Sequence, residues 1–333
     1  VYTFEGQPPP RLFVLPDREG RGPVSAADEA ITAEAVVCLA RYDFDLAPGA
    51  SRSLAFKMPY TPVPLTDEAM VEALRRASFE EYLTRTRGWW RRYLSEGAQI
   101  EVPEAKVTDA QKAGLAYLAI ARDKRGDDFV PCVNKFQYHA FWVRDGAYIV
   151  AAHDFYGRHE WARQGLDFFL KQQRADGIIY QPPQLDGWGQ SLWAFGNHWR
   201  LTGDVDFARR VYPALARHVR AVMSRTREDP LGLVPPAPPY DNEAINGHYT
   251  GHSLLLLAGL RDVIAMADAL GETDDARDFR AYHDEYEANF RRAVAEVTAR
   301  TGGYLPPGLD AGPGCDWGNG LMTYPRGGLP SRG

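Results

Sequence analysis

Apolar residues recur at three- and four-residue intervals along most of the chain after about residue 107, which is the period of amphipathic α-helices. Val211, Leu215, Val219 and Val222 show this spacing clearly. The pattern predicts seven helices in this part of the chain, over 107–122, 144–156, 159–175, 189–202, 205–226, 248–270 and 273–298. The chain is therefore predicted to be mainly helical.

One short turn occurs three times between these helices. Each copy is a Gly followed five residues later by Ala-Arg, and the copies begin at Gly157, Gly203 and Gly271. A Gly that ends one helix shortly before the next begins is typical of a tight connection between antiparallel helices. If these turns lie at one end of a stack of helical hairpins, the longer connections lie at the other end.

The longer connections contain the side chains best suited to chemistry. Their sequences include Trp142-Val143-Arg144-Asp145, Asp186-Gly187-Trp188-Gly189-Gln190, Asp241-Asn242-Glu243 and Cys315-Asp316-Trp317-Gly318-Asn319. Each segment combines carboxylates with an amide or an indole, which is typical of sites that bind polar ligands. We therefore expect a functional site at the end opposite the short turns.

The first two long connections allow a functional and a structural interpretation. Arg144 offers a planar set of donors for sugar hydroxyls, or it forms an ion pair with Asp145 that caps the helix. The glycines around Trp188 allow a sharp turn that leaves an indole face uncovered for stacking on a sugar ring. Alternatively, this indole folds back onto the helices.

In the third connection, the prolines between Pro235 and Pro239 precede Asp241 and Glu243. A proline-stiffened loop can hold a carboxyl group in a partly dehydrated position, which raises its pKa toward that of a general acid. Asp241 also fits a helix cap or an Asx-turn, whereas Glu243 has no such simple structural role. In the fourth connection, Asp316 and Trp317 again join a carboxylate to an indole.

Residues 1–64 have a different character. They are rich in Pro and contain alternating segments at 12–15, 35–40 and 53–58 that predict β-strands. These few strands cannot close a sandwich, so we expect the C-terminal remnant of a larger β domain. Residues 65–104 are predicted to be a linker helix capped by Thr66 or Asp67, and residues 105–333 the N-terminal part of a helical domain.

Composition limits the partners of the chain. With 38 Lys and Arg against 44 Asp and Glu, the net charge of −6 argues against a nucleic-acid partner. No apolar run approaches the roughly 20 residues that span a bilayer, so a membrane partner is not expected. The three cysteines lack the spacing of a zinc site or a disulfide framework, so neither a metal nor a cofactor is predicted. The sequence does not indicate a cellular compartment.

Taken together, residues from about 105 to 325 resemble the glucoamylase-type glycoside hydrolases, which belong to the six-hairpin glycosidases with an (α/α)6 barrel. The family motif Trp-x-Arg-Asp, with a Tyr six residues before the Arg, matches Trp142, Arg144, Asp145 and Tyr138. The resemblance implies that these residues bind the sugar at the non-reducing end. Trp188 loosely resembles a family aromatic residue that packs against bound sugar.

The family motif Glu-Glu-Val-Asn-Gly matches residues 243–247, which implies that Glu243 is the general acid. Asn242 and Ala244 depart from the family pattern of Trp and a second Glu, so starch-like specificity is not predicted. The general base of the family lies after about four more helices than this chain has, so the resemblance implies that the base is missing here and that this chain alone is inactive. The resemblance therefore implies an incomplete (α/α)6 toroid, with about seven of twelve helices and a β-sandwich remnant.

The implied activity is hydrolysis of O-glycosidic bonds in oligo- or polysaccharides, exo-acting and with inversion. A non-catalytic carbohydrate-binding (α/α) barrel remains an alternative, since it would keep the same sugar-binding residues. Another alternative is a different α/α toroid enzyme, such as a prenyl-transfer or metal-dependent cyclase domain. The absence of an Asp-rich diphosphate motif and of a Cys/His ligand set in the sequence argues against this second alternative.

Overall fold

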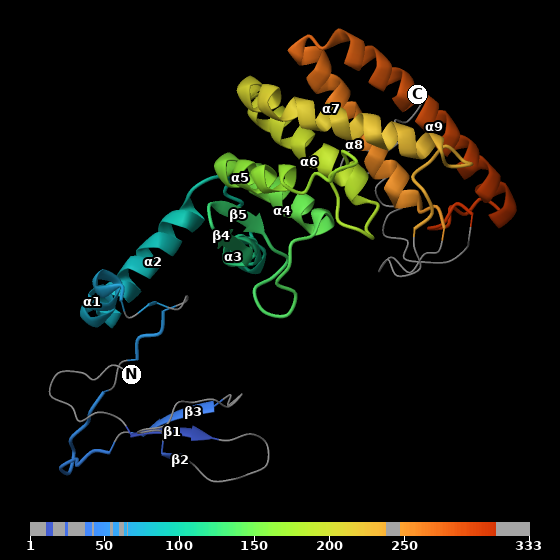
Figure 1. The fold of residues 1–333 in the computed structure, drawn as a ribbon. Coiled ribbons are helices and arrows are strands. Elements are labelled where there is room, and N and C mark those ends of the chain that lie inside the picture. The colour runs from blue at the N-terminus through green and yellow to red at the C-terminus, as the bar shows by residue number, and fades with distance from the viewer. Residues whose placement is uncertain are drawn as a thin grey trace. The chain divides into compact units, whose positions relative to one another are not determined.

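The protein is mainly helical (Figure 1). The computed structural model describes residues 43–53, 56–59, 63–64, 66–237 and 247–310, together with the backbone of three short strands nearer the N-terminus. Packing divides the chain into two compact units, Val1–Arg85 and Thr86–Gly333. The domain limits that the sequence predicts, after residues 64 and 104, remain predictions.

The first unit contains a small antiparallel sheet. Its strands are β1 (Arg11–Leu15), β2 (Val24–Ser25) and β3 (Val37–Arg41), in the order β2-β1-β3. Phe13 of β1 lies opposite Leu39 of β3. This pairing agrees with a β-rich N-terminal segment, and the sandwich remains a prediction. The strand expected over 53–58 is not formed at those of its residues that the structure describes.

The predicted linker helix is two helices, α1 (Glu68–Arg76) and α2 (Phe79–Ser95). As expected, Asp67 caps the first, with its Oδ1 accepting a hydrogen bond from the Met70 N–H at 3.0 Å. The prediction of one continuous helix is wrong because Ser78 begins a new one. Its hydroxyl accepts from the Glu81 N–H at 3.5 Å, as N-cap serines do.

Helix α3 (Ala105–Ala121) is followed by a β-hairpin that the helical periodicity did not predict. Its strands are β4 (Arg122–Arg125) and β5 (Asp128–Pro131). The two residues between them include Gly126, whose φ of 61° is left-handed. A Gly in a two-residue connection is a hairpin signal that was present in the sequence.

The remaining six helices form three hairpins. They are α4 (Val143–Phe155), α5 (His159–Leu170), α6 (Gly187–Thr202), α7 (Val205–Arg227), α8 (Thr250–Leu270) and α9 (Thr273–Thr301). The sequence predicted five of them to within three residues at either end, whereas α5, expected over 159–175, already ends at Leu170. Gly157, Gly203 and Gly271 have φ values of 73°, 66° and 79° and lie where the short turns were expected. The short turns are therefore confirmed.

Helices α4, α6 and α8 run parallel to one another. A Cβ placed on Gly187, at the start of α6, would lie 3.3 Å from Val143 Cγ1 at the start of α4. Near the other ends of the same helices, the Asp154 carboxylate contacts the His198 imidazole at 2.8 Å. Since each of the three helices follows a long connection, their N-termini and those connections lie at one end of the stack (Figure 1).

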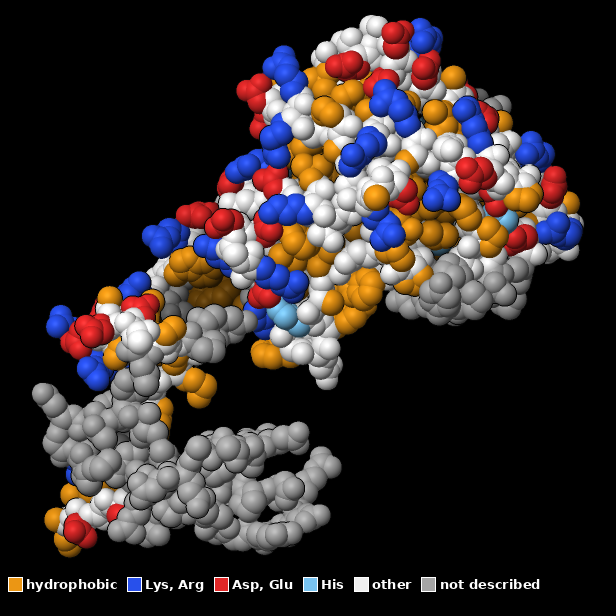
Figure 2. Space-filling model, in the orientation of Figure 1, with side chains coloured by type: hydrophobic (Ala, Val, Ile, Leu, Met, Phe, Trp, Pro, Cys, Tyr) orange, Lys and Arg blue, Asp and Glu red, His pale blue; other side chains and the backbone are white. Residues whose placement is uncertain are grey.

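The backbones of α6 and α8 are in direct contact. A Cβ on Gly189 would lie 2.3 Å from Leu255 C, and one on Gly259 would lie 2.6 Å from Gly189 O. Both helices are buried around most of their circumference, with Trp193 and Leu256 fully inaccessible. The outer helices instead present charged side chains, and on the face drawn in Figure 2 basic and acidic groups alternate over their surface.

We expect Gly259→Ala to destabilise the protein. The new methyl would require the two helices to separate, and overpacking of this kind costs about 1–3 kcal/mol of unfolding free energy. Gly114→Ala in α3 is the matched control, because a Cβ there meets nothing within 4 Å. Alanine in a helix interior is favoured over glycine, so the control is expected to be neutral or stabilising. Urea unfolding of both variants measures the difference, and equal stability would contradict the close contact.

Among the described residues, no helix is both long and apolar enough to cross a membrane. The three hairpins α4–α5, α6–α7 and α8–α9 have the alternation of short and long connections that the sequence predicted. The extension of these hairpins to a six-hairpin toroid remains a prediction.

Candidate functional site

The N-terminal ends of α4 and α6 bring five of the predicted site residues into one region. Tyr138 and Trp142 lie in the connection before α4, Arg144 and Asp145 in its first turn, and Trp188 in the first turn of α6. The helix α4 separates this region from Gly157 by its 13 residues, or about 20 Å at 1.5 Å per residue. The five residues therefore lie at the end opposite the short turns.

Arg144 and Asp186 form a buried ion pair between the two helix ends. The guanidinium Nε donates to Asp186 Oδ2, and the two side chains are 12% and 0% exposed. Arg144 therefore has a partner that the sequence did not indicate, and the alternative in which it also pairs with Asp145 to cap α4 remains a prediction. Asp186 was present in the sequence pattern as part of the second long connection, but nothing in the sequence indicated that it pairs with a residue 42 positions earlier.

Burial raises the pKa of both carboxyl groups in this region, those of Asp186 and Asp145. Burial raises the pKa of Asp186 above its ordinary value, and the Arg144 guanidinium opposes this shift. Burial also raises the pKa of Asp145, with Arg144 opposing and Asp186 adding to the rise. Two carboxyl groups that hold their protons more tightly than usual therefore lie beside one guanidinium.

Several buried polar atoms around this ion pair lack a hydrogen-bond partner among the described residues. They are Trp142 Nε1, Gln184 Oε1, Asp186 Oδ1, Trp188 Nε1, and both Oε1 and Nε2 of Gln190. Most buried polar groups in proteins are paired, so an accumulation of unpaired donors and acceptors calls for an explanation. These atoms have almost no accessible surface, so pairing them requires buried water or a rearrangement of the helix starts.

The connection before α6 is tied to the start of α4. Gln181 Oε1 accepts a hydrogen bond from the Val143 N–H at 3.0 Å. Trp142 precedes α4 and makes no side-chain cap, so Gln181 supplies the cap from another connection. This contact fixes the backbone on which Arg144 and Asp145 are mounted.

Aromatic rings border the ion pair. The Tyr138 and Trp142 ring centroids are 6.1 Å apart at an interplanar angle of 31°, and Tyr138 is 41% exposed. Asn134 holds the turn before them, with its Oδ1 accepting from the backbone N–H groups of residues 136, 137 and 138. An exposed aromatic ring on a fixed turn offers an apolar face to a ligand.

Trp188 does not have the uncovered indole face that its flanking glycines suggested. Its side chain is 4% exposed and packs edge-on against Tyr180 with centroids 5.9 Å apart. The glycines begin helix α6, and Gly189 lies against the α8 backbone. Close helix packing, and not a sharp surface turn, explains the Gly-Trp-Gly sequence.

The third long connection contains Asp241 and Glu243, which lie outside the described residues, as do Asp316 and Trp317 of the fourth. The described residues on either side of this segment, Ala237 and Gly247, pair in an antiparallel bridge in which Ala237 N donates to Gly247 O at 2.7 Å. Gly247 lies three residues before α8, whose start lies at the same end as those of α4 and α6.

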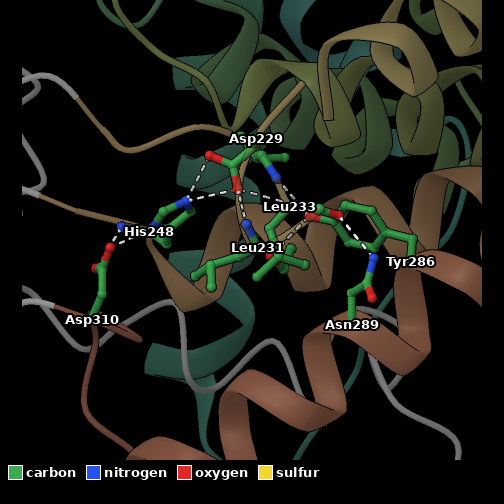
Figure 3. Close-up of polar contacts among 10 residues, drawn as sticks. Asp229, Leu231, Leu233, His248, Tyr286, Asn289 and Asp310 are labelled. Atoms are coloured by element: carbon green, nitrogen blue, oxygen red, sulfur yellow. Dashed lines mark hydrogen bonds and ion pairs between the residues drawn. The ribbon is translucent and has the colours of Figure 1, made fainter. Parts of the chain in front are cut away.

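His248 fastens this bridge to two other parts of the chain (Figure 3). Its Nε2 lies 3.0 Å from both carboxylate oxygens of Asp229, and its Nδ1 contacts Asp310 Oδ2. The His248 backbone N–H also donates to Asp310 Oδ1 at 2.9 Å. His248 is therefore a satisfied polar residue, and its contacts lie at one end of the segment that contains Glu243.

Two groups of side chains in the described ranges have the composition of metal ligands, and neither is the Arg144–Asp186 region. They are Asp123, Cys132 and His139 near the β-hairpin, and Asp154, His159 and His198 at the other end of α4 and α6. The sequence analysis considered the spacing of the cysteines only and did not indicate either group, and His198 is 44 positions from Asp154.

No protein-family model matches the chain. A curated relative, named uncharacterized glycosyl hydrolase MJ1610, from Methanocaldococcus jannaschii, is 28% identical over 185 residues. The match covers 50% of this chain and 30% of the relative, so the chain spans less than a third of that protein's length.

Two solved structures are similar at low TM-scores. A GH78 family rhamnosidase of Bacillus sp. GL1 is 20% identical, with a TM-score of 0.48, over 60% of this chain and 22% of that one. A rhamnosidase from Klebsiella oxytoca, solved with rhamnose bound, is 18% identical, with a TM-score of 0.47, over 59% of this chain and 40% of that one. Similarity at this level identifies neither the site nor its ligand.

Proposed function

We propose that this chain is part of a glycoside hydrolase that cleaves O-glycosidic bonds of oligo- or polysaccharides. The observation that carries the proposal is the buried Arg144–Asp186 ion pair, surrounded by unpaired polar atoms at the starts of α4 and α6. The archaeal relative, whose printed name is that of a glycosyl hydrolase, supports the same class of reaction.

The chemistry of sugars matches what this region offers. A sugar hydroxyl both donates and accepts, so it can accept from the Arg144 guanidinium, whose side chain is 12% exposed, and donate to the partly exposed Asp145 carboxylate. The faces of a sugar ring carry C–H groups, which pack on aromatic rings such as that of Tyr138. In this proposal Arg144 and Asp145 orient the sugar, and Trp188 supports them from the interior.

Glu243 acts as the general acid and protonates the leaving oxygen. A second carboxylate activates a water molecule on the opposite face of the sugar, so that the reaction inverts the anomeric centre. The two carboxyl groups lie about 6.5–9.5 Å apart, which leaves room for this water. Asp241 shapes the loop that presents Glu243, and Asp316 and Trp317 complete the substrate-binding region. The exo mode of action and this assignment of roles follow the family resemblance of the motifs.

Tyr138→Ala is expected to weaken sugar binding without unfolding the protein. Stacking on one aromatic ring contributes about 0.5–1.5 kcal/mol, so the dissociation constant should rise roughly threefold to tenfold. Phe136→Ala is the matched control, because Phe136 lies on the same turn and is 90% exposed but makes no ring contact with Trp142. Titration of the tryptophan fluorescence with a panel of monosaccharides measures both variants.

The titration also tests the proposal as a whole. Saturable binding of one sugar, weakened roughly threefold to tenfold in Tyr138→Ala and unchanged in Phe136→Ala, would support it. If no sugar binds, or if both variants bind as the unmodified protein does, the Arg144–Asp186 region is not a sugar site. The non-catalytic alternative is tested in a protein that contains both Glu243 and the proposed second carboxylate. If that protein binds a sugar but hydrolyses no glycoside, it is a non-catalytic carbohydrate-binding protein.

A further inference from the structure

Three helices bring Asp154, His159 and His198 together at the end of the stack opposite the proposed sugar site. Asp154 lies in the last turn of α4, His159 begins α5, and His198 lies in the last turns of α6. Asp154 Oδ1 is 2.9 Å from His159 Nδ1 and 2.8 Å from His198 Nδ1. All three ligand atoms lie within 4.8 Å of one another.

Two of these side chains are fixed in the interior and the third faces solvent. The exposed fractions are 0% for the Asp154 side chain, 2% for that of His198 and 42% for that of His159. The Phe207 ring packs against the His198 ring with centroids 4.6 Å apart, which restricts its rotation. A ligand can therefore approach from the side of His159 and meet two side chains already in position.

The buried carboxylate lacks a permanent positive partner in the described part of the chain. Its hydrogen bonds and ion pairs there are made with the two imidazoles of His159 and His198, and not with a Lys or Arg side chain. A carboxylate that loses its hydration needs compensation by a positive charge. A divalent cation would supply it, and neutral imidazole and carboxylate are ordinary ligands of transition metals.

We propose that Asp154, His159 and His198 bind a divalent transition metal, with zinc as the representative ion. Tetrahedral ligands at zinc distances of 2.0–2.2 Å lie about 3.3–3.6 Å apart, so the separations of 2.9 and 2.8 Å between Asp154 and the two imidazoles would have to widen by about 0.4–0.8 Å. Each imidazole would coordinate through Nδ1 and carry its proton on Nε2. The remaining coordination positions would face solvent beside His159, and the metal would fasten α4, α5 and α6 to one another.

The other group of this composition is less suited to a metal. In the cluster of Asp123, Cys132 and His139, the Lys135 ammonium already lies 2.6 Å from Asp123 Oδ1. The Arg125 guanidinium lies 3.6 Å from the same carboxylate and 3.4 Å from Cys132 Sγ. Burial raises the pKa of the Cys132 thiol, which disfavours the thiolate that binds metals. Fixed cations thus occupy the position that a metal would take.

The experiment uses the tag-free chain, stripped with a chelator, incubated with zinc chloride and desalted. We expect close to one zinc per chain by elemental analysis, and an unfolding midpoint several degrees above that of the stripped protein. His159→Gln should abolish both effects, and its exposed position makes it compatible with folding. The matched control is His283→Gln, since His283 contacts a single carboxylate, Asp284, at 3.2 Å; it should bind zinc as the unmodified chain does.

Cobalt substitution gives a second readout, because the visible spectrum of bound cobalt reports nitrogen and oxygen ligands and should disappear in His159→Gln. The proposal is overturned if the unmodified chain retains no zinc, or if His159→Gln retains as much as the control. It is also overturned if Cys132→Ser, and not His159→Gln, abolishes binding, because the metal would then lie near the β-hairpin.

Discussion

In a protein that contains both Glu243 and the second carboxylate, Glu243→Gln is expected to lower the rate of hydrolysis of a natural oligosaccharide by about 10²–10⁴-fold while sugar binding persists. Glutamine keeps the shape of the side chain but cannot donate a proton to the leaving oxygen. Activated aryl glycosides leave without protonation, so their hydrolysis should suffer least. Comparing kcat for the two kinds of substrate, with sugar binding measured separately, isolates the loss of the acid.

Asp241→Asn is the matched control for this variant. Asp241 lies two residues earlier in the same connection, and the proposal gives it a role in shaping the loop only. We therefore expect a much smaller loss of activity on the same oligosaccharide. Near-normal hydrolysis by Glu243→Gln would remove Glu243 from the mechanism, and greater damage from Asp241→Asn would make Asp241 the better candidate for the general acid.

The second large effect is expected from the buried ion pair. Arg144→Met leaves the fully buried Asp186 without its guanidinium partner, and breaking a buried pair in this way costs about 3–5 kcal/mol of unfolding free energy. Arg209→Met is the control, because Arg209 and its partner Asp206 are 67% and 94% exposed, and such surface pairs contribute little. Urea unfolding at neutral pH measures both changes.

The cost of Arg144→Met should depend on pH with a defined sign. The pKa of Asp186 is already raised by burial, and removing Arg144 takes away the charge that opposes this rise. A carboxyl group whose pKa is higher in the folded protein than in the unfolded chain binds more protons when folded. Stability therefore falls as pH rises above the ordinary Asp range, and more steeply in the variant.

A double variant separates the charge effect from lost packing. Arg144→Met combined with Asp186→Asn has no buried charge, so it should recover much of the stability at neutral pH and lose the added pH dependence. If Arg144→Met alone is no less stable than Arg209→Met, or if its stability rises with pH, the buried pair does not behave as its geometry indicates.

Local signals in the sequence were sufficient for the helices and the short turns. The helical period depends on which residues face the core, and the left-handed glycines Gly157, Gly203 and Gly271 need no distant partner to end a helix. The predicted and observed limits of α4, α6, α7 and α8 therefore agree closely. From this alternation alone, the starts of α4, α6 and α8 could be predicted to share one end.

The tertiary structure decided which side chains meet. Arg144 pairs with Asp186, 42 positions away in the sequence, because parallel packing of α4 and α6 places their first turns side by side. Trp188 is buried because α6 packs closely against α8, which no local pattern specified. Asp154 and His198 are 44 positions apart and meet only through the same packing. Local backbone preferences act over a few residues, whereas these contacts depend on how whole helices pack. The local sequence therefore determined most of the helices and turns, and the tertiary structure determined which polar side chains contact one another.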